Sequence, residues 1–241
     1  MDIQFVDTFG GQDDVVIVPV FKNKELGANA ENLDKLYAGF ISATLRHEDK
    51  FNGEAGQSLT IRPVAGAKRI VLAGMGGDDE KITKDTAIKI ASTIDKAVRA
   101  SGYENATFLC EDFFDDDEMN ADFTATLADV IRLKSYSFDK YKAKKADGFK
   151  RLSFAFNNVA DVQKAYQPKH ETTSGVFLAR DMSNEPPNIM TPEKAAQTIQ
   201  DELGSLPGVT IRVLDEKDME NEKMGAELAV GQGSINPPRM V

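Results

Sequence analysis

Short apolar, β-branched runs alternate with stretches of helical periodicity as far as residue 157 of this chain. The runs typical of strands lie near residues 2–6, 14–21, 58–63, 68–73, 105–110 and 149–156. Between them, apolar side chains recur every three or four residues, from Leu33 to Ile41 and from Ala87 to Val98, and a further helix is expected over 119–133. Strands that alternate with amphipathic helices build layered α/β domains. We therefore predict an α/β fold with a largely parallel or mixed sheet.

The pattern changes after residue 157, where the first unit is expected to end. A long helix is predicted to start at Val159 and to stop by about Asn184, because the prolines at 186 and 187 lack an amide donor and crowd the preceding turn. Thr191 is a good N-cap and Pro192 suits the first helical position, so a second helix is expected from there to about residue 203.

The last forty residues predict further elements of the same kind. A strand is expected at 209–214, followed by a short helix begun by Asp215. Gly231 and Gly233 are expected to allow a tight turn, and residues 239–241 look like the opening of another strand. A domain rarely ends on the first step of a strand, so we expect a truncated protein. Its cut domain should be poorly ordered after about residue 190, or pair with a second copy.

Composition and charge indicate which partners the chain does not bind and in which cellular compartment it is expected. The chain has 241 residues and a formal net charge of −10, which makes nucleic acid and anionic membranes poor partners. The longest apolar run, at 15–20, is too short to span a bilayer, and the N-terminus lacks the features of a signal peptide. We expect a soluble, cytoplasmic protein. The single cysteine, Cys110, ends an apolar run and is expected to be a buried strand residue rather than a reactive thiol.

Three short stretches are candidate sites, and each also has a simpler structural interpretation. "GMGG" at 74–77 follows a strand and precedes a helix, like a phosphate-binding turn, but a plain turn with positive φ explains it better. The acidic run at 111–120 could bind a metal, but a solvated loop that favours the next helix start is preferred. A basic stretch is read as a solvated loop and strand edge rather than a phosphate-binding patch; it holds Lys140, Lys142, Lys144, Lys145, Lys150 and Arg151.

No catalytic or metal-binding motif emerges from the remaining residues. His47 and His170 are far apart in the sequence and neither has a zinc-type spacing. The sequence has no G-x-S-x-G motif, and Cys110 has no candidate base nearby in the sequence. A metal site built from histidine and cysteine is therefore not expected in this chain.

Two long segments carry a resemblance to a known family. The segments are "LARDMSNEPPNIMTPEKAA" at 178–196 and "VLDEKDMENEKMGAELAVGQGSINPPRMV" at 213–241. They closely resemble the leucyl aminopeptidase family, the M17 cytosol aminopeptidases, at the start of its catalytic domain. The matching positions are Ala179, Arg180, Asp181, Asn184, Pro186, Asn188, Thr191 and Pro192, then Met224, Gly225, Gly231, Gly233, Ser234, Pro237, Pro238 and Arg239.

The resemblance implies a domain organisation. Residues 1–157 are similar to the family's N-terminal domain, a three-layer α/β unit with a macro-domain-like fold and a mixed sheet. Residues 158–190 would form a linker helix and an inter-domain turn, and residues 191–241 the incomplete start of the catalytic domain. Arg180 and Asp181 are interpreted as architecture: ordinary capping and surface pairing is preferred over a contact with a neighbouring subunit.

The resemblance also implies a function: a metal-dependent aminopeptidase, typically a homohexamer, that releases N-terminal residues from peptides. The family holds two divalent metals, zinc or manganese, in segments resembling "KGxxFDxGG" and "NTDAEGR", and neither segment occurs here. We therefore assign no catalytic, metal-binding or cofactor-binding residue and expect this chain to be inactive alone, its N-terminal domain serving assembly and access. The alternative is that the α/β domain is a binding module for a nucleotide-like ligand or for nucleic acid.

Overall fold

The computed structural model describes residues 1–9, 13–63, 66–77, 83–143 and 150–241. The chain divides into two compact units, Met1–Gly175 and Val176–Val241, and the boundary falls inside one long helix. Each unit is described by itself. None of the described helices combines the length and the apolar character that a bilayer crossing needs.

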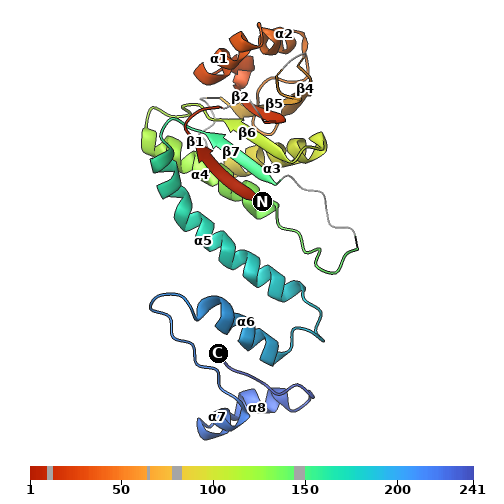
Figure 1. The fold of residues 1–241 in the computed structure, drawn as a ribbon, viewed down its shortest axis with the longest axis vertical. Coiled ribbons are helices and arrows are strands. Elements are labelled where there is room, and N and C mark those ends of the chain that lie inside the picture. The colour runs from red at the N-terminus through yellow and green to blue at the C-terminus, as the bar shows by residue number, and fades with distance from the viewer. Residues whose placement is uncertain (10–12, 64–65, 78–82, 144–149) are drawn as a thin grey trace. The chain divides into compact units, whose positions relative to one another are not determined.

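The first unit is built on a mixed sheet (Figure 1). Its described strands are β1 (Asp2–Val6), β2 (Val15–Phe21), β3 (Glu25–Leu26), β4 (Ser58–Ile61), β5 (Arg69–Gly76), β6 (Asn105–Leu109) and β7 (Arg151–Ala155). Its described helices are the 3-10 turn η1 (Lys22–Lys24), α1 (Ala28–Leu36), α2 (Phe40–His47), α3 (Lys84–Ser101), α4 (Asp117–Lys134) and the first turns of α5 (Val159–Asn184). The predicted α/β class with a mixed sheet is confirmed, and each predicted strand of this unit is present within a few residues.

The strand order is β1-β7-β6-β2-β5-β4, with β3 paired to β2 beside this path. Strands β1, β7, β6, β2 and β5 run parallel, whereas β4 and β3 pair antiparallel with their neighbours. The central strand β2 is a buried apolar run, as a parallel strand covered on both faces requires. Pro19 is tolerated there because the described pairing of β2 with β6 ends at Ile17, before the proline.

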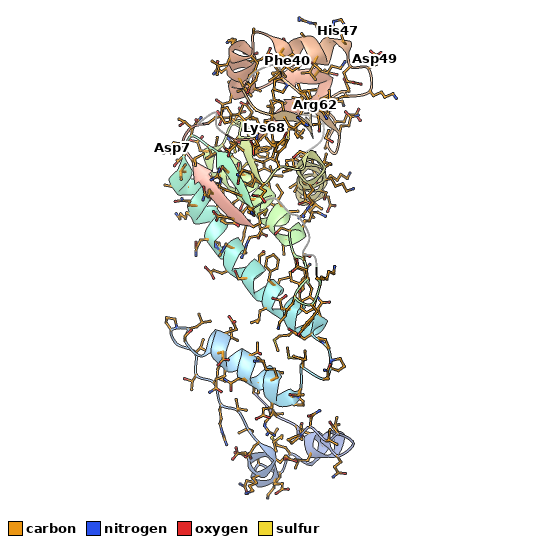
Figure 2. The ribbon with its side chains drawn as sticks, turned by 45° about the vertical axis from the view of Figure 1, so that its right-hand side comes forward. Asp7, Phe40, His47, Asp49, Arg62 and Lys68 are labelled. Carbon is orange, nitrogen blue, oxygen red and sulfur yellow. The ribbon has the colours of Figure 1, made fainter. Side chains whose placement is uncertain are left out.

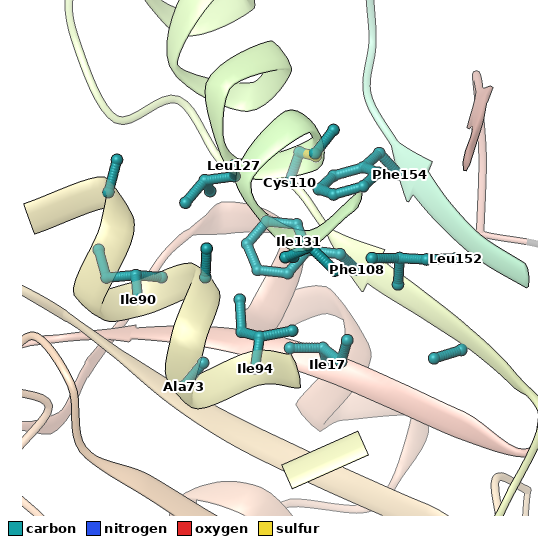
Figure 3. Packing of buried hydrophobic residues seen from close by; sticks show 14 of the residues in the cluster. Ile17, Ala73, Ile90, Ile94, Phe108, Cys110, Leu127, Ile131, Leu152 and Phe154 are labelled. Carbon is teal, nitrogen blue, oxygen red and sulfur yellow. The ribbon is translucent and has the colours of Figure 1, made fainter. Parts of the chain in front are cut away.

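The two faces of the sheet are covered by different helices. On one face, α3, α4 and the start of α5 pack on alternate strand residues, including Ile17, Phe108 and Phe154. Figure 3 shows Ile90 and Ile94 of α3 and Leu127 and Ile131 of α4 meeting these side chains. On the other face, α1 and α2 cover the residues in between, such as Val16, Val18 and Leu72. The first unit therefore has three layers, helix, sheet and helix.

The apolar stripe predicted as one segment over 33–41 is in fact divided between two helices. Helix α1 ends at Leu36, Ala38 and Gly39 have positive φ, and α2 begins at Phe40. The buried Asp34 carboxylate fixes this break by accepting hydrogen bonds from the amides of Ile41 and Ser42. Leu36 is consequently 80% exposed rather than buried.

The second unit contains the last turns of α5 followed by α6 (Pro192–Leu203), α7 (Glu216–Asn221) and α8 (Gly225–Gly231). Helix α5 ends at Asn184, as predicted, and it continues through Pro168, where the sequence suggested an interruption. Thr191 caps α6 through a hydrogen bond from the Lys194 amide (3.3 Å), with Pro192 at the first helical position. Asp215 and Asp218 form a capping box at α7. These predicted helix starts are confirmed.

The strand predicted at 209–214 is wrong. The described backbone there has only an isolated bridge between Leu214 and Met240. The strand expected to begin at residues 239–241 is likewise reduced to this single bridge. A β-branched run needs a paired neighbour to become a strand, and this unit offers none. The tight turn predicted at Gly231 and Gly233 is confirmed. The Ser234 amide donates to the Gly231 carbonyl across it (3.1 Å), although neither glycine has positive φ.

Candidate functional site

In open α/β sheets, ligands bind at the carboxyl ends of the strands where the strand order reverses direction. Here that point lies at β2, which pairs with β5 on one side and β6 on the other. Soon after β2 the chain enters α1, and after β6 it continues into the acidic run at 111–120. The first place to examine for a binding site is therefore the start of α1 and the end of β6.

The start of α1 is occupied by a carboxylate of the chain itself. Glu111 is only 3% exposed, and its two carboxylate oxygens accept hydrogen bonds from the amides of Asn29 (3.0 Å) and Ala30 (2.6 Å). The Asn29 side chain in turn donates to the Cys110 carbonyl (2.7 Å). Gly27 is needed beside it, because a Cβ there would lie 2.5 Å from the Glu111 carboxyl carbon. We call these residues, Gly27, Asn29, Ala30 and Glu111, the carboxylate latch.

The latch uses the groups that would otherwise bind an anion. The first amides of a helix lack intrahelical partners and attract negative charge, and the N-cap residue Gly27 has no side chain to satisfy them. Burial raises the pKa of Glu111, the hydrogen bonds from Asn29 and Ala30 lower it, and Asp112 and Glu31 raise it further. The start of α1 is thus filled by an internal carboxylate, which leaves no room for a phosphate at the same amides.

The latch corrects one interpretation of the acidic run. Asp112 and residues 115–118 are exposed, and Asp116 caps α4 through the Met119 amide (2.8 Å), as a solvated loop at a helix start predicts. Glu111, however, is buried. Its partners lie about 80 residues away in the sequence. Two features of the sequence could have indicated that Glu111 is buried: the apolar run before it, and the glycine at the start of α1, which has no side chain to cap the helix.

The glycine turn at 74–77 has the predicted positive φ, at Gly76 (85°). Gly74 lies inside β5, where a Cβ would meet the Glu54 carbonyl oxygen at 2.1 Å, so the loop before β4 crosses directly over the strand. The residues that complete the turn, 78–82, lie outside the described part of the chain. Residues 74–76 are thus the end of β5, and of the predicted turn only the positive φ at Gly76 is described.

The other candidate residues are scattered over the first unit. Cys110 is buried, as predicted, and burial raises the pKa of its thiol well above the ordinary value, which keeps it protonated. His47 ends α2 at the far side of the helix layer (Figure 2), whereas His170 lies on α5, which covers the opposite face of the sheet. Among the residues that the structure describes, no group of three or more histidine, cysteine, aspartate or glutamate side chains could hold a metal ion.

The basic stretch at 140–151 is not a strand edge, which corrects that part of its interpretation. Strand β7 lies inside the sheet, between β1 and β6. Lys150 pairs with Glu104 (2.8 Å) and Arg151 with Asp13 (2.9 Å), so each of these two cations has a carboxylate partner in the first unit. Lys144 and Lys145 lie outside the described residues.

The segments that carry the family resemblance lie in the second unit. Arg180 and Asp181 are exposed near the end of α5, and their interpretation as architecture remains a prediction. The second unit buries only Ala196 and Met219 among its apolar side chains. Among its described residues, no group of three or more histidine, cysteine, aspartate or glutamate side chains could hold a metal ion.

Comparison with protein families gives two matches in succession. Residues 17–145 match the model of the cytosol aminopeptidase family, N-terminal domain, and residues 177–241 match that of the cytosol aminopeptidase family, catalytic domain. A probable cytosol aminopeptidase of Bradyrhizobium sp. is 36% identical over 91% of this chain and 42% of its own length. One from Rickettsia bellii is 33% identical over 100% of this chain and 49% of its own length. The chain spans about half the length of these curated relatives.

Solved structures show the same fold at lower sequence identity. A mutant of tomato leucine aminopeptidase matches 99% of this chain and 49% of its own, with a TM-score of 0.79 and 22% identity. The bottromycin maturation enzyme BotP in complex with Mn matches 94% of this chain and 44% of its own, with a TM-score of 0.70 and 20% identity.

Proposed function

This chain belongs to the cytosol aminopeptidase family, and we propose that it is the N-terminal part of a metal-dependent enzyme that releases N-terminal amino acids from peptides. One observation carries the proposal: the two family models match in their proper order, at 17–145 and 177–241. In this proposal, residues 1–157 are the N-terminal α/β domain, 158–190 a linker helix and inter-domain turn, and 191–241 the beginning of the catalytic domain.

Peptide-bond hydrolysis in this family rests on two divalent metals, which would activate a water, polarise the scissile carbonyl and hold the free amine of the substrate. The described residues do not fit such a centre. Within the acidic run, Glu111 turns inward to α1 while Asp116 caps α4, so these carboxylates do not converge on one point. We therefore assign no step of the reaction to a residue of this chain and propose that residues 1–241 are inactive alone.

The N-terminal domain has a supporting role in this proposal. Its three layers form a complete core, and it is proposed to serve assembly and substrate access in a homo-oligomer, a hexamer by family resemblance. The proposed enzyme acts on peptides and is located in the cytoplasm, in keeping with relatives that are named cytosol aminopeptidases. The net charge of −10 counts against nucleic acid as a partner.

The carboxylate latch counts against the alternative function, a nucleotide-binding module. A phosphate at the start of α1 would have to displace Glu111 from the amides of Asn29 and Ala30. The acidic residues that follow Glu111 would also repel it.

A calorimetric titration with Mn²⁺ tests the proposed division of labour. Residues 1–241 should bind no stoichiometric Mn²⁺, whereas a longer chain that continues through the catalytic-domain length of the relatives should bind two ions. Stoichiometric binding by residues 1–241 would contradict the proposal, as would the absence of binding in the longer, folded chain.

A further inference from the structure

The edge of the sheet formed by β1 borders a groove that the proposed peptidase function does not use. Among the described residues, β1 pairs only with β7 and so ends the sheet (Figure 1). The groove has a volume of about 510 Å³, in the range of pockets that hold ligands. Two elements of the first unit line it: residues 3–6 of β1, and Gln163, Tyr166, Gln167 and His170 of α5.

The backbone of β1 offers unpaired groups to this groove. The Asp2 amide donates to the Lys150 carbonyl (2.7 Å), and the Val6 carbonyl accepts from the Phe156 amide (2.9 Å). In a parallel ladder the backbone groups of alternate residues point to alternate sides, so Asp2, Gln4 and Val6 bond to β7. The amides and carbonyls of Ile3 and Phe5 then point away from the sheet, where another strand would lie.

The side of the groove formed by α5 contains a buried hydroxyl without a partner. Tyr166 is only 7% exposed, and its ring packs edge-on against Phe5 (centroids 5.2 Å apart). Its hydroxyl has no hydrogen-bond partner among the described residues, and neither does the buried Nδ1 of His170, whose ring lies 5.7 Å from that of Tyr166. Burial raises the pKa of Tyr166 to about 12, so the hydroxyl remains a donor. A buried donor of this kind favours a ligand that supplies an acceptor.

The charge of the groove selects a neutral occupant. Its lining side chains include no lysine, arginine or carboxylate, and their polar groups are the amides of three glutamines, the Tyr166 hydroxyl and the His170 ring. The two carboxylates beside these amides already accept hydrogen bonds from them, Asp2 from Gln4 and Glu171 from Gln167 (2.6 Å each). Backbone amides and apolar side chains of a ligand match both the free strand edge and Phe5. Grooves bounded by a strand edge and a helix bind peptides by adding a strand to the sheet.

We propose that β1 and α5 form a docking site for an extended, uncharged peptide segment, which pairs with the free backbone groups of Ile3 and Phe5 and accepts a hydrogen bond from the Tyr166 hydroxyl. A two-fold copy of β1 fits less well, because α5 lines the same groove and the copy would bring its own α5 against it. The site does not depend on the proposed peptidase activity.

Solution NMR of the full 241-residue chain tests this site, with an N-acetylated, C-amidated pentapeptide of alternating threonine and valine as the probe. The acetylated N-terminus leaves no free amine, so an aminopeptidase cannot hydrolyse the probe. Binding should shift the amide signals of Ile3 and Phe5 and slow their hydrogen exchange. Chain assembly is followed by light scattering in the same samples.

Two variants separate the strand edge from the hydroxyl. Ile3→Pro removes one outward amide but no bond to β7, a position where edge strands accept proline, and should weaken binding at least tenfold. Tyr166→Phe removes a single oxygen and should weaken binding about fivefold, even if Ile3→Pro disturbs the fold. Tyr141→Phe, at an exposed tyrosine outside the groove, is the matched control and should bind like the native chain.

Three results would overturn the proposal. The first is no change at Ile3 and Phe5 with the probe at millimolar concentration. The second is equal affinity of the native chain and both groove variants. The third is slow exchange at these amides in a dimeric chain without the probe, which would assign the edge to a second copy.

Discussion

The carboxylate of Glu111 ties the end of β6 to the first turn of α1. Its two oxygens satisfy two helix amides that the N-cap residue, Gly27, cannot reach. The same carboxylate is buried, which disfavours its charge. The latch therefore holds two segments together at the carboxyl edge of the sheet while keeping the protonation of one residue sensitive to pH.

Replacement of Glu111 by glutamine should change how stability depends on pH. The pKa of Glu111 is raised above 4.5 in the folded chain, so the folded state binds more protons than the unfolded state just above that pH. Its contribution to stability is fully present below pH 4.5 and is lost as the pH rises through the raised pKa. The native chain should thus lose stability relative to Glu111→Gln over this window, with a slope of at most about 1.4 kcal/mol per pH unit.

Urea unfolding at a series of pH values measures this effect. Glu118→Gln, at an exposed position of the same acidic run, is the matched control, and its stability curve should remain parallel to that of the native chain. A constant difference between the native chain and Glu111→Gln across the window would show that Glu111 titrates alike in the folded and unfolded states.

Local patterns at the residue scale predicted some environments and missed others. The burial of Cys110 follows from the apolar run before it, and the caps at Thr191 and Asp215 follow from their immediate neighbours. The latch could not be predicted, because its partners are brought together only by the pairing of strands distant in the sequence. The groove beside Tyr166 was missed for the same reason.

At the scale of elements, the central strands and the helices that cover them hold the first unit together. Strands such as β2 were predicted correctly because a parallel strand covered on both faces is a continuous apolar run, which is easy to recognise in a sequence. The β-branched residues at 209–213 look similar in sequence, but no neighbouring strand pairs with them. The division of 33–41 into α1 and α2 depends on the buried Asp34, which periodicity alone does not show.

Two leucines test this account of the core. Leu127 of α4 is fully buried against the sheet, whereas Leu36 of α1 is 80% exposed despite its place in the helical pattern. Leu127→Ala should lower the free energy of unfolding by about 2 to 5 kcal/mol, since it removes buried contacts and leaves a cavity. Leu36→Ala should change it by less than about 0.5 kcal/mol. Urea unfolding followed by circular dichroism measures both, and a larger loss for Leu36→Ala would show that α1 packs differently.

At the scale of the whole molecule, the two units differ in how much apolar surface they bury. The first unit has apolar cores on both faces of its sheet. In the second unit, Val230 is 86% exposed and Ile235 is 99% exposed. The fold of the first unit could be predicted from its repeated strands and helices. The second unit could be recognised from its sequence motifs, and its helix starts could be predicted from their caps. The expected strand at 209–214 could not be judged from sequence, since no neighbouring strand pairs with it.

Limited proteolysis should therefore cut the second unit first and leave a fragment close to residues 1–175. The physical reason is that backbone with few buried contacts opens more often than backbone in a packed core. Mass spectrometry of timed trypsin digests identifies the cuts, and light scattering of the undigested chain detects pairing with a second copy. A monomer that resists cleavage equally over its whole length would contradict the contrast between the units.

The hydrolysis of a leucine anilide, with Mn²⁺ or Zn²⁺ added, tests the central claim most directly. Residues 1–241 are compared with a longer chain that continues through the catalytic-domain length of the relatives. We predict release of the anilide by the longer chain and none by residues 1–241, since the described residues do not form a metal site. Metal-dependent hydrolysis by residues 1–241 alone would contradict the claim.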